Sequence, residues 1–294
     1  MSESAPALAG FEAISCRFDG ETRSVYVRGQ GPGVLLMHEI PGITPQVQAC
    51  AERIADAGFR VYMPWLFGTP GKPLSMPYAL GEMARTICIR REFTALARGR
   101  SSPVTDWLRG LARQIHAECG GPGVGAVGMC LTGGFALTLM LEPAVIAPVL
   151  SQPSLPLPVP GLAKKNGPEI DIAPADLEAV KQRLEAENLS VLGLRLSEDA
   201  FCPRERFDGL RQRLGEHFEV FEIDSSPGNP HGFGRAAHSV LTTEFRDQPG
   251  FPTREAMDRV IAFYRERLLA PAGPAAGGAD AGWETESGAA PSTE

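Results

Sequence analysis

The sequence predicts an α/β domain with a mostly parallel central sheet, helices on both faces and an antiparallel ribbon at the start. Short apolar runs of the kind needed by strands buried on both faces alternate with segments whose apolar residues have helical spacing. Near the start, an Asp-Gly pair between two strand-like segments indicates a hairpin. Because strands that alternate with helices are joined by crossovers, most of the sheet is expected to be parallel.

The elements follow in order along the chain. Asp19-Gly20-Glu21 separates the two hairpin strands, the apolar run from Gly33 to His38 predicts an interior strand, and Gly58 ends a helix whose small and apolar residues have helical spacing. Pro, Gly and Arg dominate residues 64–103, which predicts an excursion over the sheet that holds one helix. The expected elements up to that point are strands at 13–18, 23–28, 33–38 and 59–63 and helices at 46–57 and 80–97.

Strand and helix then alternate again, interrupted by a Pro-rich loop at 152–168. The expected elements are helices at 104–118, 131–141, 174–187, 203–214 and 253–268 and strands at 124–128, 145–150, 190–196 and 217–223. We therefore expect a single domain over residues 10–270. The segment 271–294 is acidic and rich in Ala, Gly, Pro and Ser, so it is expected to be disordered.

Composition excludes several classes of protein. A net charge of -7 argues against nucleic acid or an anionic membrane as a partner. No apolar run approaches the roughly 18 residues of a membrane span. The six cysteines show neither Cys-x-x-Cys pairs nor metal-ligand spacing, which favours reduced thiols in a cytoplasmic protein without a metal or cofactor. The expected partner is a small molecule, bound by a monomer or small homo-oligomer.

The segment Gly128-Met-Cys130-Leu-Thr132-Gly133 is the candidate nucleophile turn. It joins the end of a predicted interior strand to the start of a helix, and ligands gather at the carboxyl ends of such strands. A Gly two residues before the thiol permits a tight turn, and the helix N-terminus favours the thiolate. The usual pattern has a second Gly where this chain has Thr132. The other five cysteines are interpreted as structural.

A thiol nucleophile needs a base, and His231 is the preferred candidate because Pro and Gly residues keep its loop off regular structure after the last strand. His238 stays a lesser alternative in a predicted short helix. His38 is interpreted as a core histidine or a neighbour of the site, and His116 and His217 as solvated or structural groups.

The base in turn needs an acid that orients it. Asp199 follows the predicted strand 190–196, which places it at the carboxyl edge of the sheet, beside the loop that holds the candidate base. Asp224 and Glu198 are the alternatives, although Asp224 would more naturally cap a turn.

With these residues in place, the sequence resembles the dienelactone hydrolase family (carboxymethylenebutenolidases) over roughly residues 10–268, which implies an α/β-hydrolase fold. The resemblance rests on four segments: His38-Glu-Ile-Pro-Gly-Ile43, Gly128-Met-Cys-Leu131, the Asp199 loop with Cys202-Pro203, and His231-Gly-Phe-Gly-Arg235.

The resemblance implies a Cys-His-Asp triad that opens a lactone through an acyl-enzyme. It also implies that Glu39 interacts with the thiol and helps to form the thiolate, and that the backbone N–H groups of Ile40 and Leu131 form the oxyanion hole. Arg235, four residues after His231, is an implied ligand for a substrate carboxylate, and Arg91 or its neighbour Arg90 is the candidate for a second one.

The expected function is therefore cysteine-dependent hydrolysis of a lactone or a small activated ester, with or without a carboxylate on the substrate. Two alternatives stay open. The departure at Thr132 is compatible with a binding protein that has lost catalysis, and a lone reactive thiol is compatible with redox chemistry, although no second cysteine lies nearby to resolve it.

Overall fold

The structure is a computed structural model that describes residues 5–88, 103–158 and 163–269. One eight-stranded sheet runs through it, in the order β1-β2-β4-β3-β5-β6-β7-β8. Pairing is antiparallel between β1 and β2 and between β2 and β4, and parallel everywhere else. The strands are β1 (Glu12–Phe18), β2 (Glu21–Arg28), β3 (Gly33–Met37), β4 (Arg60–Pro64), β5 (Val124–Met129), β6 (Val145–Ser151), β7 (Val191–Leu196) and β8 (Phe218–Ile223).

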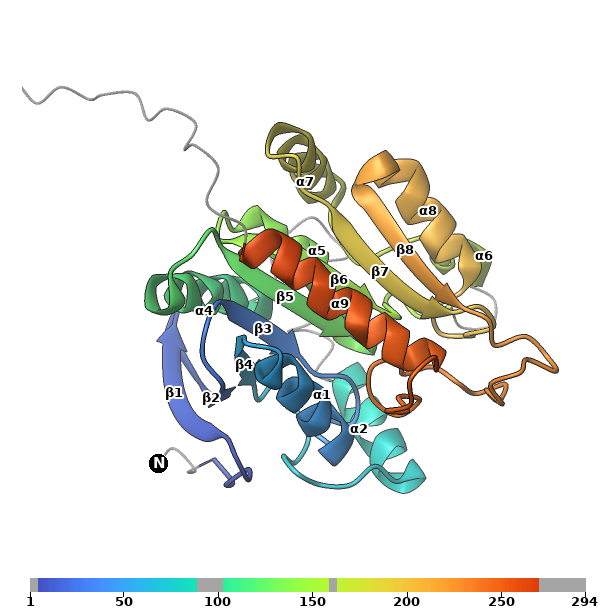
Figure 1. Cartoon of the computed structure of the whole chain (residues 1–294), viewed down its shortest axis with the longest axis horizontal. Helices are drawn as coiled ribbons and strands as arrows, with labels where there is room; N and C mark the ends of the chain where they lie inside the picture. Colours follow the sequence, from blue (N-terminus) through green and yellow to red (C-terminus); the bar gives the residue numbers. More distant parts are fainter. Residues whose placement is uncertain (1–4, 89–102, 159–162, 270–294) are drawn as a thin grey trace, which may run out of the picture.

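Helices cover both faces of this sheet (Figure 1). Buried side chains of α1 and α9 pack on one face, and those of α4, α5, α7 and α8 pack on the other. The bounds of the helices are α1 (Pro45–Asp56), α2 (Met76–Cys88), α4 (Pro103–Cys119), α5 (Phe135–Thr138), α6 (Ala163–Asn166), α7 (Pro174–Ala186), α8 (Arg204–Leu214) and α9 (Pro252–Leu268). The predicted layers and parallel sheet are confirmed.

The N-terminal hairpin is also confirmed. Phe18 of β1 pairs with Glu21 of β2, so the loop consists of Asp19 and Gly20. Both loop residues have positive φ, 50° and 84°, as a two-residue loop that matches the twist of its strands requires. The second strand therefore begins two residues earlier than the sequence pattern predicts.

The continuous helix predicted at 131–141 is not formed. The segment instead forms a 3-10 turn η2 (Cys130–Thr132), the short α5 and a second 3-10 turn η3 (Leu139–Leu141). The first turn is tightened because the Thr132 hydroxyl accepts a hydrogen bond from the backbone N–H of Met129. Further along, the predicted strand at 217–223 begins at Phe218, after a 3-10 turn η4 (Gly215–His217).

Two long connections differ from their predictions. In the excursion at 64–103 the helix α2 begins at Met76, four residues before the predicted helix, and the predicted part from 89 to 97 lies outside the described residues. The Pro-rich loop at 152–168 holds the short α6. The C-terminal segment 271–294, expected to be disordered, lies outside the described residues too.

The parallel strands end at one edge of the sheet, where the candidate site lies. The segments that follow β3, β5, β6 and β7 all leave the sheet at this edge, as does the segment after β8. Side chains far apart in sequence are therefore brought together there.

Candidate active site

Cys130 stands in a sharp turn directly after β5. Its φ is +54°, a left-handed backbone conformation that is uncommon for residues other than Gly. A Cβ added at Gly128 would lie 2.1 Å from the backbone O of Thr132, so only Gly fits two residues before the thiol. The turn therefore holds Cys130 in a strained conformation at the end of the strand, where strain commonly marks function.

Thr132 occupies the position where the usual turn has a second Gly, and the structure explains why a side chain is tolerated. The residue is fully buried, and its Oγ1 accepts from Met129 N at 3.0 Å. The same hydroxyl donates toward Met37 O at 2.9 Å, at the end of β3. Thr132 thus joins the nucleophile turn to the segment that carries Glu39 and Ile40.

The thiol of Cys130 is partly exposed and has a polar neighbour that sequence analysis missed. The hydroxyl of Ser154, beyond the end of β6, donates to Cys130 Sγ over 3.0 Å. The backbone N–H of Ser154 also donates to Cys130 O at 3.0 Å.

Asp199 lies at the end of β7 and contacts His238. The distance between His238 Nδ1 and Asp199 Oδ2 is 2.7 Å, and the Asp199 side chain is 1% exposed. The second carboxylate oxygen accepts from the backbone N–H groups of Phe201 and Cys202, which fixes its orientation. Asp199 is thus placed to orient an imidazole, as its position in the sequence suggests.

The imidazole of His238 is coupled electrostatically to the thiol. Burial lowers the pKa of His238, whereas the charge of Cys130 and the hydrogen bond with Asp199 raise it, and the result lies well above the usual value. Its Nε2 is buried and makes no well-aligned hydrogen bond to any described residue. A protonated imidazole here favours a thiolate at Cys130.

His231, the preferred base from sequence, does not contact Asp199, and the histidine that does is His238, the lesser alternative. The His231 ring packs edge-on against Phe251, with 5.5 Å between ring centroids, in a loop braced by the side chain of Asn229. The histidine that contacts Asp199, His238, lies seven residues further along the chain. His238 lies in an irregular segment between two turns, whereas the sequence suggests a short helix there.

Glu39 also differs from its implied role. Its buried carboxylate accepts hydrogen bonds from Gln152 Nε2 at 3.2 Å, from Ser239 Oγ at 2.8 Å and from the hydroxyl of Thr242. None of its hydrogen bonds within the described residues goes to Cys130. Glu39 therefore anchors the segment that carries His238, since Ser239 and Thr242 both belong to that segment.

Only one of the two implied carboxylate ligands belongs to the part of the chain that the structure describes. Arg235 is exposed, and Arg91 lies outside the described residues. Four residues after His238 stands Thr242, whose hydroxyl binds Glu39. The implied oxyanion donors, Ile40 and Leu131, belong to the segments that follow β3 and β5, and Ile40 N–H donates to no described residue.

His38 is a core histidine at the end of β3. It is fully buried, its Nε2 accepts from Leu66 N at 3.1 Å, and its Nδ1 lies 3.2 Å from Glu39 O. Burial lowers the pKa of His38 to about 4, so the ring is neutral near pH 7. His38 fixes the backbone of the segment that leads to Glu39.

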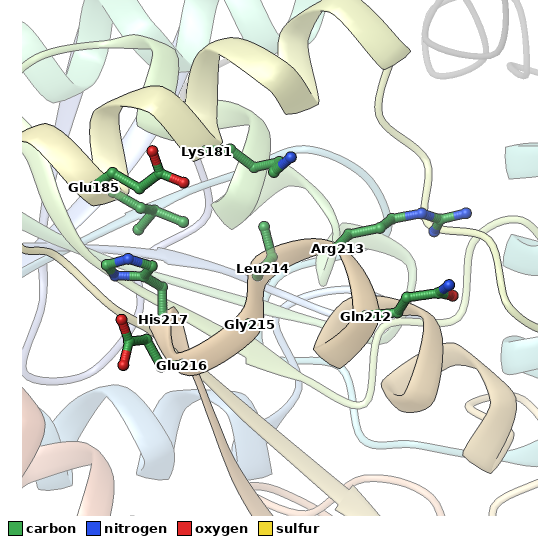
Figure 2. A pocket seen from close by; sticks show the side chains of 9 residues that line it. Lys181, Glu185, Gln212, Arg213, Leu214, Gly215, Glu216 and His217 are labelled. Atoms are coloured by element: carbon green, nitrogen blue, oxygen red, sulfur yellow. The ribbon is translucent and has the colours of Figure 1, made fainter.

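A hollow of about 440 Å³ lies at the opposite edge of the sheet from the candidate site (Figure 2). It is bordered by α7 and by the turn between α8 and β8, and charges of both signs surround it, including Lys181, Glu185, Arg213 and Glu216. The ring of His217 borders the hollow and lies 2.8 Å from Leu189 O through Nδ1. This hollow contains none of the candidate site residues.

The described residues hold no cluster of three or more His, Cys, Asp or Glu side chains arranged for a metal ion. Among the helices of the same residues, none is both long and apolar enough to cross a bilayer.

Solved structures share this fold. A Klebsiella pneumoniae protein assigned as a dienelactone hydrolase aligns with a TM-score of 0.58 and 18% identity over 87% of this chain and 98% of its own. The dienelactone hydrolase of Anabaena variabilis aligns with a TM-score of 0.54 and 17% identity over 88% and 98%. A dienelactone hydrolase-like promiscuous phosphotriesterase from metagenomic libraries gives 0.56 and 15% over 88% and 98%. At these identities the likeness establishes the fold, which is that of the α/β-hydrolases.

The family follows from the sequence as a whole. The model of the dienelactone hydrolase family matches residues 22–263, most of the chain, and the protein belongs to that family. A search of curated proteins found no matching relative. The family and fold that the four sequence segments imply are thus confirmed, and an ester-type hydrolase is indicated.

Proposed function

We propose that the protein is a cysteine-dependent hydrolase that opens a lactone or cleaves a small activated ester through an acyl-enzyme on Cys130. The observation that carries this proposal is the 2.7 Å contact between His238 and Asp199 next to a thiol in a strained turn. Nucleophile, acid and histidine also follow one another along the chain in the order used by hydrolases of this fold.

In the proposed reaction the Cys130 thiolate attacks the carbonyl carbon and forms a C–S bond. The C–O bond to the leaving oxygen then breaks, and the imidazolium of His238 gives that oxygen its proton. A water molecule next attacks the thioester while neutral His238 takes its proton, and the acid product leaves as the thiolate re-forms. Asp199 keeps the imidazole in the tautomer that this cycle requires.

The carbonyl oxygen gains negative charge in both steps. We assign the backbone N–H groups of Ile40 and Leu131 as its donors, because they flank Cys130 on the segments after β3 and β5. Each such donor commonly lowers the barrier by about 3 kcal/mol. Thr132 supports this arrangement, since it joins the two segments through Met37 O.

The described part of the site favours a neutral substrate over a carboxylate-bearing one. Thr242 stands four residues after His238, where the resemblance implies an arginine, and its hydroxyl is engaged by Glu39. Phe201 is 46% exposed and its ring lies 5.4 Å from that of His238, so it offers an apolar contact beside the proposed base. A small lactone or an ester with an apolar leaving group fits these features.

The test is hydrolysis of 4-nitrophenyl acetate and of a panel of enol lactones by the wild-type protein and by Cys130→Ala. Cys119→Ala is the matched control, because that thiol lies at the end of α4 and is also partly exposed. We expect turnover that is lost only in Cys130→Ala. Equal rates for all three proteins on every substrate would refute the proposal.

The same measurements address the binding protein suggested by the departure at Thr132. Stoichiometric binding of a lactone without turnover would favour it. We further propose that the domain at 10–270 works in the cytoplasm as a monomer or small homo-oligomer, in keeping with the free thiols of its described cysteines.

A further inference from the structure

Ser154 is held against the nucleophile by two separate hydrogen bonds. Its hydroxyl donates to Cys130 Sγ and its backbone N–H donates to Cys130 O, each over 3.0 Å. Ser154 is 1% exposed, so its hydroxyl is shielded from solvent. Because the hydroxyl is buried, its hydrogen bond to the Cys130 sulfur does not compete with solvent.

Arg206 of α8 holds the neighbouring backbone in place. Its guanidinium is fully buried and donates to Pro153 O at 2.6 Å and to Phe201 O at 3.1 Å. The remaining bonds of this side chain go to three further carbonyls of the 156–169 segment, those of Pro156, Asn166 and Glu169.

The nucleophile turn also contacts this backbone. A Cβ added at Gly133 would lie 2.6 Å from Pro153 Cα, so the two segments are in direct contact. The residue directly before Ser154 is thus contacted both by Arg206 and by the nucleophile turn.

The strength of the hydrogen bond from Ser154 depends on the charge of the Cys130 sulfur. A thiolate accepts a hydrogen bond much more strongly than a thiol or a thioester, because hydrogen bonds to charged groups are roughly twice as strong. The hydroxyl of Ser154 thus interacts most strongly with Cys130 when the sulfur is negatively charged. That occurs before acylation and again when the sulfur leaves the acyl carbon.

We propose that Ser154 is a further catalytic residue, whose hydroxyl stabilises the Cys130 thiolate as nucleophile and as leaving group. This inference rests on the proposed function for its catalytic consequence. Its effect on the thiolate is measurable without any substrate.

The experiment follows alkylation of Cys130 by iodoacetamide between pH 5 and pH 10 in the full-length protein, read by mass spectrometry of the peptide that contains Cys130. The proteins are wild type, Ser154→Ala and Ser190→Ala. Ser190 is the matched control, since its buried hydroxyl donates to Glu219 at the opposite edge of the sheet. Circular dichroism checks that each variant is folded.

We expect Ser154→Ala to react about tenfold more slowly than wild type near pH 6, because less thiolate is present without the donor. At the alkaline end of the range the difference should shrink or reverse, because hydroxide removes the thiol proton without help from the donor and the sulfur lone pairs of the variant are no longer engaged. The two profiles therefore converge or cross. Ser190→Ala should follow wild type throughout.

A profile for Ser154→Ala that coincides with wild type would overturn the proposal. So would a uniform reduction at every pH, since that indicates a misplaced thiol. Turnover of 4-nitrophenyl acetate separates this result from the proposed function: converging alkylation profiles without turnover in wild type would refute hydrolysis and leave the role of Ser154 in thiolate stabilisation intact.

Discussion

The imidazole of His238 lies 2.7 Å from the carboxylate of Asp199, whereas His231, seven residues earlier, packs against Phe251. We therefore predict that His238→Gln lowers kcat/KM for 4-nitrophenyl acetate by about 10² to 10⁴, the usual contribution of a general base. His231→Gln is the matched control and should retain activity within a few-fold. A greater loss in the His231 variant would reassign the base.

Gly128 and Gly134 give a matched pair in and next to the nucleophile turn. A methyl group at Gly128 would meet the backbone O of Thr132 at 2.1 Å, whereas at Gly134 the nearest atom is a flexible carbon of Ile170 at 3.4 Å. Gly128→Ala should lower the free energy of unfolding by about 3 kcal/mol or more, as overpacking against rigid backbone does. Gly134→Ala should change it by less than about 1 kcal/mol. Urea denaturation measures both, and similar values for the two variants would contradict the geometry.

Thr132→Val replaces the buried hydroxyl by a methyl group of similar shape. Because Met129 N loses its acceptor, the free energy of unfolding should fall by about 1 to 3 kcal/mol. Thr132→Ser keeps the hydroxyl and should lose less than the Val variant. If Val is as stable as Thr in urea, the hydroxyl does not join β3 to the turn in the way described.

The contact between Glu39 and Thr242 joins residues that are 203 positions apart in the chain. Glu39→Gln, Thr242→Val and the double variant form a cycle whose coupling free energy should be about 1 kcal/mol or more, because the two residues share a buried charged hydrogen bond. Both single variants should also lower kcat, since Glu39 anchors the segment of His238. Additivity to within about 0.5 kcal/mol would argue against the anchor.

The buried ring of His38 predicts a pH dependence of stability. A histidine in the unfolded chain takes up a proton near pH 6.5, but burial lowers the pKa of His38 to about 4 in the folded protein. Between these values the unfolded state binds more protons. Stability is therefore lost as the pH falls from 6.5 toward 4, by up to about 1.4 kcal/mol per pH unit from this residue.

His38→Gln has no titrating ring and should lack this contribution, while its amide oxygen can still accept from Leu66 N. The measurement is the difference in free energy of unfolding between wild type and variant at several pH values. A difference that stays constant from pH 7 to pH 4 would contradict the assignment of a neutral buried His38.

Sequence reasoning located the strands because each one is a short apolar run that can be recognised within a single segment. The carboxyl edge of the sheet follows from where these runs end. Cys130 and Asp199 were proposed on that basis, because each lies shortly after the end of a buried strand. His238, now the proposed base, was only the lesser alternative in the sequence. Two histidines lie seven residues apart in one irregular segment, and local patterns do not show which of them reaches Asp199.

Ser154, Thr242 and Gln152 were missed for a related reason. Each is an ordinary polar residue in a loop, and its partner is 24 to 203 residues away in the chain. Such contacts depend on the order of strands in the sheet. Thr132 illustrates the same limit of sequence reasoning. A Thr fits in the turn because its hydroxyl donates to the carbonyl of Met37, which lies at the end of a different strand.

The carboxylate of Glu39 receives donors that lie 113, 200 and 203 residues further along the chain. During synthesis this acid is made early, and two of its three donors emerge only after most of the protein has been translated. A growing chain that ends before residue 238 has neither its proposed base nor the hydroxyls that satisfy this buried charge. The thiol of Cys130 is thus expected to gain its full reactivity only after the segment with His238, Ser239 and Thr242 has been made.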